Sequence, residues 1–185
     1  MDFKTKTLLT IQRGLIGVGA LGDPSFKQWF GRSKVVAADG QPLIVYRGTK
    51  SGVAVHDDSW WTGDPFVAAE YGSIVTQAYL RIENPATDSD LDDLISQYIF
   101  KTGGADLSRY DDGELLPARD QAVSVVGFRS FVMAFGFDGL LVFDDSHDGN
   151  AGISYVVFCR DQVTPITSCV TNHVQDDGLN RNLLG

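Results

Sequence analysis

Three separate segments of the chain hold the residue types best suited to binding chemistry. In the first, residues 45–49, an apolar run delivers Arg47 and then Gly48 to the end of an expected strand. Arginine can grip a phosphate through two parallel hydrogen bonds, and glycine lets the backbone approach a flat ligand closely. This segment therefore suits a planar, phosphorylated ligand.

The second and third segments add aromatic and polar side chains. Residues 59–71 place two adjacent tryptophans, Trp60 and Trp61, before a capped helix that is expected to end near Tyr71. Residues 137–158 contain two apolar stretches, expected to be strands, on either side of a polar loop.

Two other patterns have simpler explanations. Residues 17–22 match Gly-x-Gly-x-x-Gly, but a dinucleotide-binding loop needs a β-α-β unit around it, and none is evident here. We interpret residues 1–22 as a Gly-rich arm. The histidines, His56, His147 and His173, are dispersed and no Gly-x-Ser-x-Gly turn occurs, so neither a metal site nor a Ser-His-Asp triad is favoured.

Five ordered motifs resemble the ADP-ribosyltransferase superfamily, most closely its phage-associated, polyvalent-protein branch. They are the Trp-Phe-Gly-x-Ser-Lys-Val-Val stretch at 29–36, the strand end at 45–49, the Thr-x-Asp-Pro helix start at 62–65, Leu-Arg-Ile-x-Asn-Pro at 80–85 and Ser-Tyr-Val-Val-Phe at 154–158. The resemblance implies an α+β fold, a split β-sandwich with an NAD+-binding cleft between two small sheets flanked by helices.

The resemblance also implies which residues bind NAD+. They are Arg47, Gly48, Thr49, Trp60, Trp61, Thr62 and Tyr71. The Gly48 backbone would hold the nicotinamide carboxamide, Arg47 would contact the phosphates or a ribose, and Tyr71 would stack on nicotinamide. One of the two tryptophans would form the other wall of the site. Plain core packing is the alternative for the tryptophans and for Tyr71.

One position departs from the family pattern. The family usually carries a glutamate where this chain has Ser154, at the start of the last core strand. Breaking the nicotinamide–ribose bond develops positive charge on the ribose, which an anion stabilises and a neutral hydroxyl does not. Three explanations stay open: an acid of the preceding loop substitutes (Asp144, Asp145 or, as the named candidate, Asp148), the protein binds without catalysing, or Ser154 is an inactivating replacement of glutamate.

The resemblance implies an ADP-ribosyltransferase, a phage or bacterial effector or toxin that transfers ADP-ribose to a macromolecule and releases nicotinamide. Arg47, Ser154 and Asp148 would serve catalysis, NAD+ would be the co-substrate, and no metal is expected. A protein acceptor is favoured over a nucleic acid. The alternatives are an impaired NAD+- or ADP-ribose-binding module that occludes a partner, and an NAD+ glycohydrolase. The acceptor and the oligomeric state are left open.

The composition agrees with a globular protein. The chain has 185 residues, 43% of them hydrophobic, which excludes a mainly disordered protein. With 24 acidic and 15 basic residues its net charge is −9, so a protein that coats nucleic-acid duplexes is disfavoured. Cys159 and Cys169 lack zinc-site spacing and suggest reduced thiols. No apolar run is long enough to span a membrane, and a cytoplasmic location, in the producing cell or a host, is expected.

The elements that must position the site residues do not alternate regularly, which favours an α+β fold over a doubly wound parallel sheet. Helices are expected at 24–30, 65–71, 89–101 and 118–135. Strands are expected at 43–46, 74–82, 140–143, 153–158 and 163–166. We expect an arm over 1–22, one transferase-like domain over 23–170 and a polar tail over 171–185.

Overall fold

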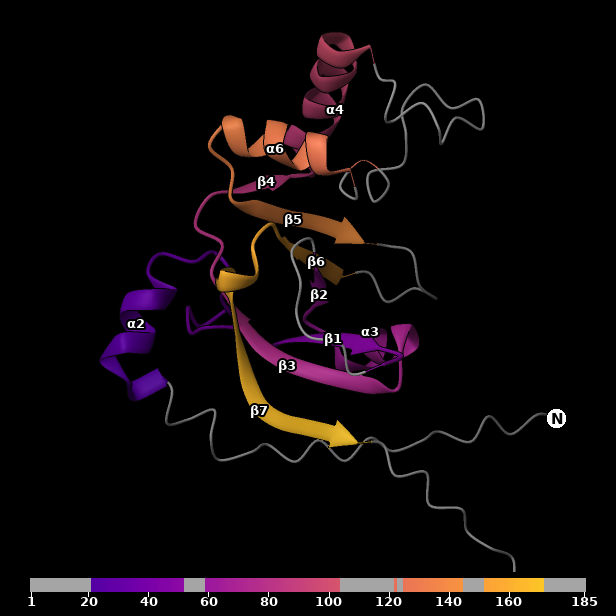
Figure 1. The fold of residues 1–185 in the computed structure, drawn as a ribbon. Helices are drawn as coiled ribbons and strands as arrows, with labels where there is room; N and C mark the ends of the chain where they lie inside the picture. The colour runs from indigo at the N-terminus through magenta and orange to yellow at the C-terminus, as the bar shows by residue number, and fades with distance from the viewer. Residues whose placement is uncertain (1–20, 52–58, 104–121, 123–124, 145–151, 172–185) are drawn as a thin grey trace, which may run out of the picture.

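A seven-stranded mixed sheet carries the fold. The structure, a computed structural model, describes residues 21–51, 59–103, 122, 125–144 and 152–171 (Figure 1). The strand order is β4-β5-β6-β2-β1-β3-β7, and β4–β5 is its one parallel pair among the described strands. The strands are β1 (Val45–Thr49), β2 (Trp60–Thr62), β3 (Ile74–Leu80), β4 (Pro85–Thr87), β5 (Gly139–Asp144), β6 (Gly152–Val157) and β7 (Val163–Thr171).

The strands form one hydrogen-bonded sheet, whereas two small sheets were expected. Strand β2 pairs with β6 through three registered residue pairs and with β1 through a single pair, Tyr46 opposite Thr62. Strand β1 pairs with β3 through five residue pairs. The sheet therefore has two halves, β4-β5-β6-β2 and β1-β3-β7, that are joined at a narrow connection.

Several helices and a short 3-10 turn of the described part accompany the sheet. They are α2 (Pro24–Phe30), α3 (Pro65–Tyr71), α4 (Asp88–Thr102), α6 (Val126–Ala134) and η2 (Arg160–Gln162). In Figure 1, α4 and α6 lie beside β4 and β5, and α2 lies at the other half of the sheet near β3 and β7. The helices thus cover two separate parts of the sheet.

The core divides between the two faces of the sheet. On the face that we call the helix face, Leu140, Val142 and Val156 pack with buried residues of α4 and α6, and Tyr79 packs with Phe26 and Phe30 of α2. On the opposite face, the central cluster is Val35, Val45, Trp61, Ala78, Leu80, Ile82, Tyr155, Val157 and Val163. Alternation of side chains along each strand accounts for this division.

Side-chain caps explain where the helices begin. Asp23 caps α2 by accepting from the Ser25 N–H at 2.8 Å, and Asp64 caps α3 by accepting from the Phe66 N–H at 2.8 Å. Both starts were predicted. The helix expected over 89–101 begins at Asp88 instead: Thr87 is its N-cap, and the Asp90 carboxylate accepts from the Thr87 backbone N–H at 2.8 Å.

Other differences from the expected elements are short or terminal. Strands β2 and β4, each of three residues, were not expected. Within the helix expected over 118–135, Ala122 is helical, but Val125 is extended, so a separate helix, α6, begins at Val126; residues 118–121 and 123–124 lie outside the described part. Leu21 packs against the α2 cluster, so the folded domain begins before residue 23.

Candidate functional site

Three adjacent strands bring the three chemistry-bearing segments together. Tyr46 of β1 lies opposite Thr62 of β2, and Thr62 lies opposite Ser154 of β6. Residues directly opposite in an antiparallel pair point to the same face, so the three hydroxyl groups belong to one row on the helix face. We call Tyr46, Thr62 and Ser154 the hydroxyl row.

The middle and far end of the hydroxyl row are shielded from solvent. Thr62 is 9% exposed and Ser154 is 7% exposed, whereas Tyr46 is half-buried. The Thr62 Oγ1 accepts from the Asp64 N–H at 3.2 Å, so the same threonine also fixes the turn from β2 into α3. The row thus joins the sheet to the start of α3.

Tight packing holds α3 against β1. A Cβ on Gly48 would overlap the Ala68 carbonyl oxygen of α3, and a Cβ on Gly72 would overlap the backbone of Thr49. Glycine at both positions lets the helix backbone touch the strand backbone. The close approach at Gly48 was predicted for a ligand, but on the helix face the structure places the α3 backbone there.

The aromatic side chains near the row differ in accessibility. Tyr71, at the end of α3, is 53% exposed, and Phe66 on the same helix is 54% exposed. Trp60 is half-buried against the cluster under α4 and α6. Trp61 is 1% exposed in the central core cluster, and its indole N–H donates to the Ser59 hydroxyl at 3.0 Å. Core packing and this hydrogen bond are therefore enough to explain a tryptophan at position 61.

Arg47 lies on the other face of the sheet from the hydroxyl row. It follows Tyr46 in β1 and is registered with Thr76 of β3, and successive side chains of a strand alternate in direction. The register does not bring Arg47 and Ser154 to one face. Thr49 ends the strand, and its hydroxyl donates to the Ile74 carbonyl at 3.5 Å. Phosphate binding by Arg47 stays a prediction.

The neighbours of Ser154 in the sheet are uncharged. Its registered partners are Thr62 on β2 and Val142 on β5. The next residue, Tyr155, points to the opposite face, where burial raises the pKa of its phenol. No carboxylate thus occupies a registered position beside Ser154 on the described strands.

Several predicted residues lie outside the described part of the chain. They include the candidate acids Asp145 and Asp148 and all three histidines; Asp144 is described as the last residue of β5 but not in its side chain.

Among the described residues, no three His, Cys, Asp or Glu side chains gather closely enough to hold a metal ion. Cys159 carries a thiol rather than a disulfide. No helix of the described part is long and apolar enough to cross a membrane.

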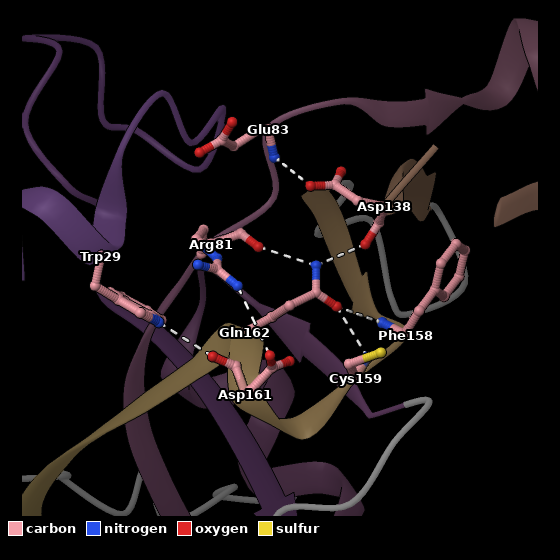
Figure 2. A network of polar contacts seen from close by, with 8 residues as sticks. All are labelled: Trp29, Arg81, Glu83, Asp138, Phe158, Cys159, Asp161 and Gln162. Carbon is pink, nitrogen blue, oxygen red and sulfur yellow. Dashed lines mark hydrogen bonds and ion pairs between the residues drawn. The ribbon is translucent and has the colours of Figure 1, made fainter. Parts of the chain in front are cut away.

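A polar network centred on the buried Gln162, which the sequence did not predict, ties the strand ends together (Figure 2). The Gln162 amide donates to the Arg81 carbonyl at 3.0 Å and to the Asp138 carbonyl at 2.6 Å. The Asp138 carboxylate accepts from the Glu83 and Asn84 N–H groups, both at 2.8 Å. The partners are far apart in the sequence, and no local pattern links them. The network fixes how β3, β5 and β6 meet.

Comparison with known proteins adds little. No protein-family model matches the chain, and no curated protein matches it in sequence. A solved structure titled "Crystal structure of an anti-CRISPR protein" is similar with a TM-score of 0.37 and 10% identity, over 67% of this chain and 95% of that chain. At this level the match assigns neither a fold nor a function.

Proposed function

We propose that the chain binds NAD+ and transfers ADP-ribose to a macromolecule, releasing nicotinamide. One observation supports this most: the β1, β2 and β6 segments that resemble ADP-ribosyltransferases lie on neighbouring strands, with Tyr46, Thr62 and Ser154 in one row. A phage or bacterial effector that acts in a cytoplasm on a protein acceptor is the corresponding biological setting.

The row supplies hydrogen bonds for a sugar. In the proposal, Ser154 and Thr62 bond the hydroxyls of the nicotinamide ribose, and burial on the helix face strengthens those bonds. Tyr71 offers an exposed ring at the end of α3, where its stacking on nicotinamide orients the bond to be broken. Arg47 lies on the other face of the sheet, so this arrangement gives it no contact with the ligand, and its binding to a phosphate stays a prediction.

A second candidate function follows from the chemistry of the row. Thr62 and Val142, the residues beside Ser154, carry no charge, so they cannot balance the positive charge that develops on the ribose. This favours a protein that binds NAD+ or ADP-ribose without transferring it and that acts by occluding a partner. NAD+ hydrolysis, with water as acceptor, would use the same row.

Incubation with NAD+ carrying a label on its adenylate, with and without a cell lysate, separates these functions. Nicotinamide release together with a labelled macromolecule supports transfer. Release without a labelled macromolecule supports hydrolysis. Binding measured by calorimetry with no release supports the binding module. If the protein neither binds NAD+ nor releases nicotinamide, the proposed function is wrong.

A further inference from the structure

Two glutamines are equally buried but differ in their hydrogen bonds. Gln162 is 6% exposed, and its side-chain amide makes four hydrogen bonds (Figure 2). Two are donated to the Arg81 and Asp138 carbonyls, and two are accepted from the Phe158 and Cys159 N–H groups, both at 2.9 Å. This amide is saturated and needs no further partner.

Gln77 of β3 is also 6% exposed. Within the part of the chain that the structure describes, no hydrogen bond to its side-chain amide is recorded, although an amide offers two donors and two acceptor positions. Burying an amide without partners costs free energy, since its bonds to water are lost and not replaced. A methionine would fill similar space without that cost, so the amide is a candidate ligand-binding group.

The register places Gln77 in line with the hydroxyl row. Gln77 lies opposite Tyr46, so on four neighbouring strands the order is Gln77, Tyr46, Thr62 and Ser154, all on the helix face. Three strand spacings of about 4.8 Å separate the first from the last, or roughly 14 Å. A nicotinamide ring with its ribose, laid along the row, fits within that span.

Because α3 packs closely on Gly48, a different residue must hydrogen-bond the nicotinamide carboxamide on the helix face. On the helix face the Ala68 carbonyl lies against the Gly48 Cα, so the ligand cannot take that position. The registered partner of Gly48 is Val75, two residues from Gln77 on β3. Gln77 is the only amide in the row, so it alone offers a donor and an acceptor on two separate atoms, as the carboxamide itself does.

We infer that Gln77 is a specificity-determining residue that recognises the carboxamide of nicotinamide. Its Nε2 donates to the carboxamide oxygen, and its Oε1 accepts from the carboxamide N–H. This inference rests on the proposed binding of NAD+. A nicotinate carboxylate has no N–H to donate and sets its second oxygen against Oε1, so the site should reject the acid form.

The test compares NAD+ with nicotinic acid adenine dinucleotide. Calorimetry on the wild type should show preference for NAD+ of about tenfold or more, because a buried acceptor is left unpaired by the acid. In Gln77→Met the affinity for NAD+ should fall about tenfold and the preference should disappear. The melting temperature of Gln77→Met should stay equal or rise, whereas that of the matched control Gln162→Met should fall.

Each failure has a distinct meaning. If the wild type binds neither dinucleotide, the proposed function is wrong and the inference falls with it. If the wild type prefers NAD+ and Gln77→Met keeps that preference, the inference alone is overturned. If Gln77→Met lowers the melting temperature as Gln162→Met does, the amide of Gln77 serves the fold and the inference is again overturned.

Discussion

Thr62 and Ser154 lie directly opposite each other on β2 and β6, 9% and 7% exposed, on the face of the sheet that α3 covers at Gly48. Two buried hydroxyls side by side suit a sugar, which both donates and accepts hydrogen bonds. The pair also shows what the row lacks, since neither residue can carry a negative charge at neutral pH.

Restoring an acid in the row should increase bond cleavage. We expect Ser154→Glu to raise the rate of nicotinamide release about a hundredfold, because a carboxylate beside the ribose stabilises the developing cation. Release is measured by chromatography, with circular dichroism to confirm folding, since a buried charge is costly. The control is Ile153→Glu, at a 48% exposed neighbour on the other face. A folded Ser154→Glu protein with lower activity would mean that the serine suits its own chemistry.

Substituting each of the two exposed aromatic residues of α3 distinguishes a role in NAD+ binding from a role in packing. Tyr71 and Phe66 are 53% and 54% exposed on the same helix, so Phe66→Ala is the matched control for removing an exposed ring. We expect Tyr71→Ala to weaken NAD+ binding about tenfold through loss of ring stacking, and Phe66→Ala to leave it unchanged. Calorimetry measures both. Equal affinities in the two variants would remove Tyr71 from the site.

The contact between β1 and α3 should tolerate no side chain at Gly48. A methyl group there meets the Ala68 carbonyl, so Gly48→Ala should destabilise the fold by about 3 kcal/mol or more. At Gly63 a Cβ would meet only the Leu43 Cδ2, at 3.9 Å, and Gly63→Ala should cost no more than about 0.5 kcal/mol. Urea unfolding measures the free energy of unfolding of both variants and the wild type. A mild Gly48→Ala variant would show that α3 can shift away from β1.

The start of α4 should respond to acid. Hydrogen bonds from the backbone and side chain of Thr87 lower the pKa of Asp90 below its usual value of 3.8. A carboxyl with a lowered folded pKa stabilises the protein above the unfolded pKa, and that stability is lost as the pH falls through the folded value. We expect Asp90→Asn to cost about 1 kcal/mol at pH 7 and the difference from wild type to shrink below pH 4.

The matched control for Asp90 is Asp93→Asn. Asp93 lies on the same helix and is exposed. Its substitution changes the net charge equally but leaves the contact with Thr87 intact. Thermal melts at pH 7 and below pH 4 compare the three proteins. A gap between wild type and Asp90→Asn that persists in acid would contradict a role for the ionised carboxylate.

The sequence by itself determined the helix starts at Asp23 and Asp64, because a cap and a proline act over a few residues. It also indicated the α+β class and most strands. It could not determine the single pairing of Tyr46 with Thr62, the distribution of Arg47 and Ser154 over two faces, or the three-residue strand β2. Register depends on partners distant in the chain, and a shift of one residue reverses every face.

The tertiary structure likewise decided which of the two buried glutamines has its hydrogen bonds satisfied within the described part of the chain. Both Gln77 and Gln162 read as ordinary polar residues in the sequence, and one stands in a strand and the other in a turn. Only the fold buries both, surrounds Gln162 with four backbone groups and sets Gln77 opposite Tyr46. Hydrogen-bond satisfaction is a property of neighbours in space, and local sequence does not contain it.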